Sequence, residues 1–215
     1  MHESSPRPHA PACERNREPI LGVLREHFAG RRHVLEIGSG TGQHVVYFAG
    51  RTPDITWWPS DLHAAHLRSI AAWRVHAGLA NIRPPQPIDL SDPAWSPAPS
   101  DGKGPDKLLA IFCANVIHIA PWRVAEGLFA GAARHLRADG RLFLYGPFKR
   151  GGKHTALSNA VFDTSLRERD AEWGVRDIAD VEALAEQVGL KLGGSFEMPA
   201  NNLILMFVRK DAAQA

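Results

Sequence analysis

The stretch His33-Val34-Leu35-Glu36-Ile37-Gly38-Ser39-Gly40-Thr41-Gly42 decides the fold of this chain. Its first half is a short apolar run, which predicts a buried strand. Its second half places three glycines at alternate positions, where the backbone can turn sharply and come close to a ligand. A helical pattern follows from Gln43 to about Ala49. A strand, a glycine turn and a helix in this order open an α/β domain.

The alternation of strands and helices continues along the rest of the chain. We expect a second strand over Ile55–Trp58 that stops at Pro59, and a turn at Ala138–Gly140. The other predicted elements are helices over Glu18–Phe28, Leu62–Ala77, Pro121–Leu136, Asn159–Arg169 and Ile178–Val188, and strands over Pro84–Ile88, Asp106–Ala114, Arg141–Tyr145, Lys191–Glu197 and Leu203–Arg209. The pattern predicts an α/β fold with a mostly parallel seven-stranded sheet, an antiparallel C-terminal hairpin at its edge, and helices on both faces.

Length and composition limit the class of protein. The 215 residues, 44% of them hydrophobic, suit one domain, which we place at 13–215 after a polar lead over 1–12 that we expect to be disordered or loosely packed. The net charge of +2 and the lack of a polybasic run argue against a nucleic-acid binder. No signal peptide and no membrane span is evident, so we expect a cytoplasmic protein.

Cysteine and histidine usage gives no sign of a metal. Cys13 and Cys113 are the two cysteines, too few for a disulfide framework or most Cys-based zinc sites, and Cys113 lies in an apolar run that predicts burial. His63 and His66 could share one helix face as metal ligands, but no third ligand stands nearby in the sequence. We therefore predict no metal.

Polar residues follow four successive predicted strands. They are Glu36, Asp61, Asp89 and Asn115. Each alone could cap a helix or lie in a solvated loop, but ligands of open α/β sheets bind at this edge, so the four together indicate a ligand site. Asp61, 19 residues after Gly42, is spaced to accept hydrogen bonds from ribose hydroxyls.

This constellation resembles a class I S-adenosylmethionine (SAM)-dependent methyltransferase, which implies the Rossmann-like fold of that class. More narrowly, it resembles the methyltransferase-like protein 26 family, whose bacterial relatives are carried as a domain of unknown function. The segments that carry the narrower resemblance cover nearly the whole chain past residue 12. They are Arg15–Leu21, the glycine loop with Gln43-His44, Trp58–Asp61, Asn115–Trp122, Tyr145–Phe148, Ser158–Asp163, Trp173–Asp177 and Met198–Asn202.

The resemblance to class I methyltransferases implies roles for the residues at the strand ends. The methionine part of SAM would lie against the loop of Gly38, Ser39, Gly40 and Gly42, with the Glu36 carboxylate pointing into the same cleft. The ribose would meet Asp61 and its neighbour Leu62, the adenine Asp89 and Leu90, and the reactive sulfonium Asn115. The irregular, proline-rich approach to Asp89 makes that position the one most in doubt.

Methyl transfer from a sulfonium is an in-line displacement, so the protein aligns the acceptor and, where needed, removes its proton. The candidate catalytic residues are His118, Tyr145 and His154; His118 could equally be a hydrogen-bonded semi-buried side chain, and Tyr145 part of the core. The candidate acceptor pocket residues are Asn16, Arg17, Lys149, Asn201 and Asn202, with turn or surface roles as alternatives. Gly146, Gly151 and Gly152 predict a mobile cover over the cleft.

The expected function is therefore SAM-dependent methyl transfer to a small molecule. A SAM-binding protein without catalysis is the alternative function, because the segment that starts at Asn115 lacks the Asn-Pro-Pro-aromatic motif of amino-methylating relatives. An RNA methyltransferase is disfavoured by the near-neutral charge. An NAD-dependent enzyme is disfavoured because Gln43 stands where the dinucleotide fingerprint needs glycine.

Overall fold

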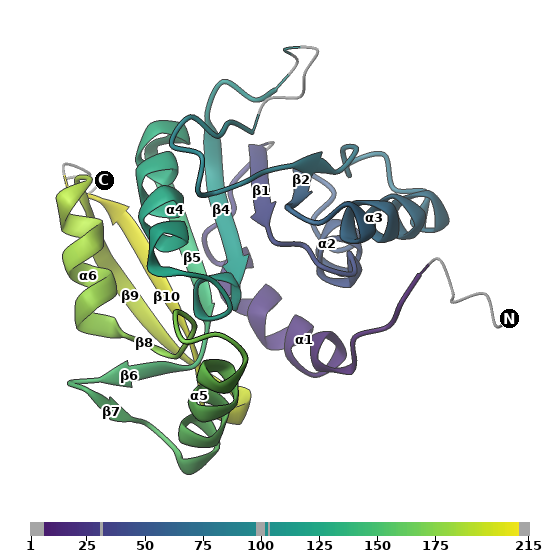
Figure 1. Cartoon of the computed structure of the whole chain (residues 1–215). Coiled ribbons are helices and arrows are strands. Elements are labelled where there is room, and N and C mark those ends of the chain that lie inside the picture. Colours follow the sequence, from purple (N-terminus) through teal and green to yellow (C-terminus); the bar gives the residue numbers. More distant parts are fainter. Residues whose placement is uncertain (1–6, 31, 98–101, 103, 211–215) are drawn as a thin grey trace, which may run out of the picture.

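The computed structural model describes residues 7–30, 32–97, 102 and 104–210, and it is built around one central sheet (Figure 1). The sheet has seven strands in the order β3-β2-β1-β4-β5-β10-β9. In chain order these are β1 (Arg32–Ile37), β2 (Ile55–Asp61), β3 (Gln86–Pro87), β4 (Leu108–Ala114), β5 (Leu136–Gly146), β9 (Leu190–Met198) and β10 (Asn202–Arg209). In the sheet order β3-β2-β1-β4-β5, each strand is parallel to its neighbours, and β10 is antiparallel to both β5 and β9. The predicted sheet with its C-terminal hairpin is confirmed.

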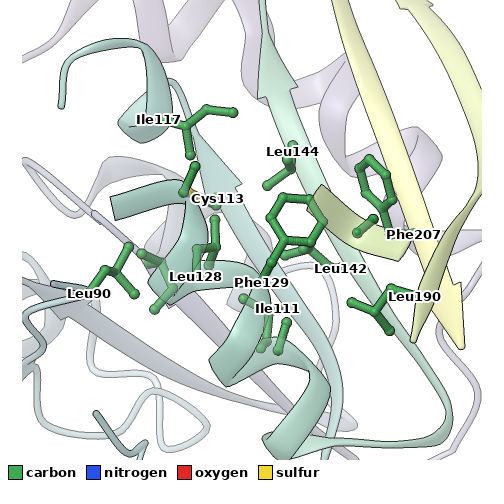
Figure 2. Close-up of a cluster of buried hydrophobic side chains, with 14 of the residues drawn as sticks. Leu90, Ile111, Cys113, Ile117, Leu128, Phe129, Leu142, Leu144, Leu190 and Phe207 are labelled. Atoms are coloured by element: carbon green, nitrogen blue, oxygen red, sulfur yellow. The ribbon is translucent and has the colours of Figure 1, made fainter. Parts of the chain in front are cut away.

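Six α-helices lie around the sheet within the described residues. They are α1 (Pro11–Arg25), α2 (Gln43–Ala49), α3 (Ala64–Ala77), α4 (Trp122–His135), α5 (Leu157–Arg169) and α6 (Ile178–Gln187), with short 3-10 turns at Val116–His118 and Pro199–Asn201. Helices α1 to α3 bury their apolar side chains on one face of the sheet. Helices α4 and α6 cover the other face, where the buried cluster includes Cys113, as predicted (Figure 2). None of the helices in the described ranges is long and apolar enough to cross a bilayer.

The first helix begins seven residues earlier than predicted, at Pro11 instead of Glu18. Pro11 lies in the first turn, where the N–H that proline lacks would have no helical partner in any case. Pro19 lies inside the helix. Residues of the expected loose lead also make contacts, since the Ala10 N–H donates to Gln43 Oε1 and Trp73 Nε1 donates to the Pro8 carbonyl. Residues 1–6 of that lead lie outside the described residues.

Strand β2 runs through Pro59 to Asp61, so the predicted stop at Pro59 is wrong. Trp57 exchanges hydrogen bonds with Asn81 and Arg83, on the side of β2 away from β1. Pro59, two residues later, faces that same side. Strand β3 pairs only from Ser60 onward, so the N–H that Pro59 lacks is not needed there. The extension carries Asp61 to the same edge of the sheet as the glycine loop.

The predicted turn at Ala138–Gly140 is a bulge within strand β5. Leu108 pairs with Leu136, whereas Ala110 pairs with Arg141. The chain therefore advances five residues along β5 while it advances two along β4. The chain absorbs the extra residues and continues as the same strand. The correction does not touch the carboxyl end of β5, where the site residues lie.

The glycine-rich segment after β5, for which we predicted a mobile cover, forms two strands of a second small sheet. This sheet contains β6 (Phe148–Arg150), β7 (Lys153–His154) and β8 (Arg176–Asp177) in the order β7-β6-β8. Gly151 and Gly152 have φ of 58° and 78°, which lets them form the two-residue turn between β6 and β7. Figure 1 shows this sheet and α5 together at the carboxyl end of β5.

Candidate functional site

The glycine loop between β1 and α2 turns through left-handed backbone at three glycines. Gly38, Gly40 and Gly42 have φ of 65°, 55° and 90°. A Cβ added to Gly42 would lie 2.9 Å from Ile70 Cα, and one added to Gly38 would collide with the Val116 side chain. A Cβ added to Gly40 would meet nothing within 4 Å. The loop is therefore packed from behind at two glycines and open in front at the third, as a cradle for a ligand requires.

Glu36 ends β1 as a buried carboxyl group beneath this loop. Only 2% of the residue is exposed, and its Oε2 has no hydrogen-bond partner within the described part of the chain. Burial raises the pKa of Glu36 to about 7, against a lowering by the Ser39 hydrogen bond, and the nearby Asp61 raises the pKa further. A buried carboxyl oxygen without a hydrogen-bond partner costs free energy unless a ligand supplies that partner. It suits a cationic or N–H-bearing group, such as the amino group of SAM.

Asp61 fastens the end of β2 to the glycine loop. Its Oδ2 accepts from the Gly40 N–H at 2.9 Å, and its Oδ1 accepts from the His63 N–H at 2.9 Å and lies 3.0 Å from His66 Nδ1. The His66 side chain, a candidate metal ligand in the sequence, therefore pairs with Asp61. No group of three or more His, Cys, Asp or Glu in the described ranges could hold a metal ion. Leu62, the next residue, is 57% exposed.

Of the two residues predicted to contact adenine, one is exposed and the other is buried in the core. Asp89 is exposed, and its Oδ1 accepts from the N–H and the hydroxyl of Ser91, which lowers the pKa of Asp89. Leu90 is 5% exposed and points into the core on the α4 side (Figure 2). The predicted packing of Leu90 on an adenine ring is therefore wrong, because the Leu90 side chain is used by the core.

A second hollow adjoins the end of β4. Asn115 has a left-handed backbone (φ 62°), unusual for a residue other than glycine, and its N–H donates to the Tyr145 carbonyl. The cavity beside it has a volume of about 490 Å³. It is lined by Asn115, Pro147, Ser158, Asn159, Phe162, Ala200, Asn201 and Asn202. The structure thus brings together three predicted residues, Asn115, Asn201 and Asn202, and adds the α5 residues that the sequence did not indicate.

Tyr145 lies at the end of β5 between this cavity and helix α1. Its hydroxyl accepts from Asn202 Nδ2 at 3.0 Å and also bonds with Asn16. Burial raises the pKa of Tyr145 despite those two hydrogen bonds. Asn16 Oδ1 in turn lies 2.8 Å from His44 Nε2. Predicted residues of the first helix, of β5 and of β10 therefore form one hydrogen-bonded chain.

His118 is fully buried, so its predicted position at the rim is wrong. The ring packs edge-on against Phe148 with centroids 5.0 Å apart, and a Cβ on Gly146 would collide with it. Neither ring nitrogen has a partner among the described residues. Burial, reinforced by the charge of Arg176, lowers the pKa of His118 to about 3. The imidazole is neutral at physiological pH and out of reach of an acceptor.

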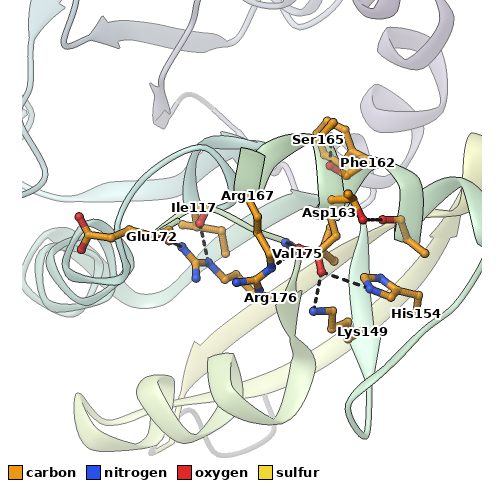
Figure 3. Close-up of polar contacts among 12 residues, drawn as sticks. Ile117, Lys149, His154, Phe162, Asp163, Ser165, Arg167, Glu172, Val175 and Arg176 are labelled. Atoms are coloured by element: carbon orange, nitrogen blue, oxygen red, sulfur yellow. Dashed lines mark hydrogen bonds and ion pairs between the residues drawn. The ribbon is translucent and has the colours of Figure 1, made fainter. Parts of the chain in front are cut away.

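Lys149 and His154 are committed to a buried carboxylate that the sequence analysis did not single out, Asp163 of α5 (Figure 3). Lys149 Nζ and His154 Nε2 lie 2.8 and 3.2 Å from Asp163 Oδ2. Asp163 Oδ1 accepts from the Val175 N–H at 2.7 Å and lies 3.3 Å from Arg167 Nε. This Asp163 cluster holds α5 against β6 and β7. Lys149 lines a different cavity, of about 760 Å³, between α4, α6 and the small sheet.

The predicted cationic residues are also used inside the protein. Arg17 lies over the Tyr47 ring, 4.5 Å from its centroid, and does not line the cavity at Asn115. Arg176 donates to the carbonyls of Ile117 and Ala120. These two arginines therefore stabilise helix and loop contacts.

With this geometry established, the chain can be compared with known proteins. Residues 7–209 match the family described as "Protein of unknown function (DUF938)". The chain belongs to the DUF938 family. That description carries no activity, and the narrower resemblance to the methyltransferase-like protein 26 family stays a prediction.

Solved structures show which fold this DUF938 protein has. Mitomycin 7-O-methyltransferase is 18% identical with a TM-score of 0.69 over 88% of this chain and 52% of its own. An O-methyltransferase family 2 protein from Planctomyces limnophilus is 16% identical with a TM-score of 0.75 over 90% and 57%. A TehB-like SAM-dependent methyltransferase from Corynebacterium glutamicum is 18% identical with a TM-score of 0.59 over 88% and 86%. The chain spans little more than half of the first two.

At these identities the likeness concerns the fold alone. The DUF938 chain has the Rossmann-like fold of class I methyltransferases, with the sheet order given above. What the neighbours bind and methylate is a property of those proteins. The site of this chain has to be argued from its own residues.

Proposed function

We propose that this protein is a SAM-dependent methyltransferase that transfers a methyl group to a small-molecule acceptor by in-line displacement. The observation that carries the proposal is the junction at Asn115. The open glycine loop and the cavity of about 490 Å³ are at the same edge of the sheet, and Val116, next to Asn115, packs behind Gly38. A methyl donor in the first hollow and an acceptor in the second would meet at this junction.

The residues of the loop suit the parts of SAM in turn. The orphaned Glu36 oxygen and the open face of Gly40 suit the methionine part. Asp61 would take the ribose hydroxyls by giving up its present hydrogen bonds, and the free Oδ2 of Asp89 would take the adenine amino group. We assign the apolar contact with the nucleoside to the exposed Leu62 in place of Leu90. When bound, SAM supplies an electrophilic methyl group on a positively charged sulfur.

The acceptor side would act by position. Asn115 and Asn202 line the cavity from β4 and β10, and Tyr145 fixes the Asn202 amide through its hydroxyl. Holding the acceptor in line with the methyl group replaces a bimolecular encounter with an oriented one, which accounts for a large share of such rate enhancements. The α5 side chains and Pro147 supply part of the lining of this cavity.

One observation favours a second candidate, a SAM-binding protein without catalysis. None of the three predicted catalytic side chains presents a free base to the cavity, because His118 is buried, His154 pairs with Asp163 and the Tyr145 hydroxyl is hydrogen-bonded. Turnover of any acceptor would exclude this alternative. SAM binding without turnover across a broad acceptor panel would favour it.

Calorimetry with SAM and with its demethylated product tests the proposed function. We expect both to bind, and we expect Asp61→Ala to lower the affinity for SAM at least about tenfold, because hydrogen bonds to a charged group contribute about 1.5–3 kcal/mol. Asp106→Ala, an exposed aspartate just before β4 at the opposite end of the sheet, is the matched control and should bind SAM normally. Absence of binding at millimolar SAM would refute the proposal, and unchanged binding by Asp61→Ala would refute the placement of the site.

A further inference from the structure

The cavity at Asn115 has no ionisable lining side chain among the described residues. Its walls are four asparagines, one serine, one proline, one phenylalanine and one alanine. A charged group of the acceptor held away from the reacting atom would meet no opposite charge there, which is unfavourable, whereas a charge on the reacting atom would face the sulfonium of SAM. The cavity therefore suits an acceptor that is neutral apart from the reacting atom.

The asparagines offer the acceptor mainly carbonyl oxygens. Asn159 Nδ2 donates to Thr155 Oγ1 and to the Asn201 carbonyl, and Asn202 Nδ2 donates to the Tyr145 hydroxyl and the Pro199 carbonyl. Both N–H groups of these two amides are thus used within the protein. The Asn115 side chain makes no hydrogen bond with any described residue, so its amide is available to a ligand. The polar groups of the cavity are neutral, and the amides of Asn159 and Asn202 are fixed before a ligand arrives.

Four ionisable side chains lie near the cavity, but none of them is among its lining residues. Tyr145 accepts hydrogen bonds at its hydroxyl, and burial raises its pKa. His118 is fully buried with a pKa lowered to about 3. Lys149 and His154 pair with Asp163, as Figure 3 shows, and neither lines the cavity. None of these four side chains is therefore placed to remove a proton from a bound alcohol or ammonium group.

We propose that the methyl acceptor is a small, otherwise uncharged thiol, which ionises in solution and enters the charge-free cavity as its own nucleophile. The inference rests on the proposed function and deepens it. Thiols ionise nearer to neutral pH than alcohols, and a thiolate is a strong nucleophile without a base beside it. Phe162 and Pro147 supply an apolar surface for the carbon part of such a compound.

The transfer balances without a protein base. The thiol proton goes to water before binding. A lone pair of the thiolate sulfur forms the new S–C bond as the bond between the methyl carbon and the sulfonium sulfur breaks, and the electrons of that bond stay on the departing sulfur. One negative and one positive charge disappear, and two neutral thioethers leave the site.

Methylation rates against pH test this proposal. The panel is 4-nitrothiophenol, thiophenol and benzyl mercaptan, with benzyl alcohol and benzylamine as matched controls. We expect transfer to the thiols, a pH midpoint of kcat/KM that follows each thiol's own pKa, and rates for the two controls at least about 100-fold lower, the factor that a missing base is worth. One midpoint common to all thiols, comparable rates with the controls, or no thiol methylated by an enzyme that binds SAM would overturn the proposal.

A second measurement does not depend on turnover. In the presence of the demethylated product of SAM, the absorbance of 4-nitrothiophenol reports its ionisation when bound. We expect no decrease in its pKa on binding, in the wild type and in Tyr145→Phe alike, because the lining offers the thiolate neither an opposite charge nor a base. A clear decrease in that pKa that Tyr145→Phe abolishes would identify Tyr145 as a base and overturn the proposal. Failure of SAM to bind, by contrast, would refute the proposed function itself.

Discussion

The two halves of the site are built on different physical principles. The glycine-loop half, at the ends of β1 and β2, uses left-handed backbone and two buried carboxyl groups, Glu36 and Asp61. The half at Asn115, between β4, β5, β10 and α5, uses neutral amides and an aromatic side chain. The first half is dictated by its backbone and charges, whereas the second is shaped by side chains that can be exchanged. A ligand common to many proteins fits the first description, and a particular acceptor fits the second.

The strongest test of the first half is the backbone of the glycine loop. Gly42→Ala should lower the free energy of unfolding by about 2–5 kcal/mol, because a left-handed residue other than glycine costs about 1–2 kcal/mol and the new Cβ meets Ile70. Gly40→Ala, which meets no atom, should cost only about 1–2 kcal/mol but should weaken SAM binding by filling the cradle. Urea unfolding and calorimetry measure both; equal stability losses would contradict this description of the loop.

The buried carboxyl group of Glu36 gives a pH dependence. Its pKa is about 7 in the folded protein against an ordinary 4.5, so the folded state holds its proton over that range while the unfolded chain has released it. Stability should therefore fall as the pH rises from about 4.5 to 7, in total by on the order of 3 kcal/mol. Unfolding of Glu36→Gln at pH 4 and pH 8 should lack this component. The same pH slope in both proteins would show that another group is responsible.

The second half depends on the Asp163 cluster that holds α5. Asp163→Asn should lower the free energy of unfolding by about 2 kcal/mol, since it leaves Lys149 and His154 without their partner in a half-buried site. SAM affinity should stay within about twofold, because no residue of the glycine loop is involved. Glu172→Gln, which removes an exposed pair with Arg123, is the control and should cost less than about 0.5 kcal/mol. A large loss of SAM binding in Asp163→Asn would show that the halves are coupled.

The smallest effect separates the two halves most directly. Asn202→Ala should raise the KM for the acceptor about fivefold, the equivalent of one neutral hydrogen bond, and should leave the Kd for SAM within about twofold. Steady-state kinetics with a thiol that the enzyme methylates give the KM, and calorimetry with SAM gives the Kd. An equal weakening of both ligands would mean that Asn202 does not belong to the acceptor side alone.

The sequence predicts the glycine-loop half well because its signals are local. The alternate glycines and Asp61 lie within 24 residues of one another, and their strands are neighbours in the sheet. One local signal was available and misread. Ile88 and Leu90 are apolar residues on either side of Asp89, and both are buried, so Leu90 could have been assigned to the core.

The half at Asn115 could be predicted only in part. Asn201 and Asn202 were found, but Ser158, Asn159 and Phe162 reach the cavity because Asp163 fixes the position of their helix. That fixation depends on residues brought together by the small sheet, which no local pattern specifies. The pair Gly151-Gly152 forms the two-residue turn that starts this sheet, but we had interpreted these glycines as part of a mobile cover. The burial of His118 follows from tertiary packing against Phe148, which its own neighbours in sequence do not reveal.

The small sheet has a consequence for how selectivity can evolve. The segment 147–177 leaves the central sheet after Gly146 and returns at Asp177, the N-cap of α6, so both of its junctions are anchored at rigid elements. Drift or engineering within this insert can reshape one wall of the hollow without disturbing the strands that carry the glycine loop. The insert thus behaves as an exchangeable module, and related chains could acquire new acceptors by replacing thirty-odd residues while the donor site stays as it is.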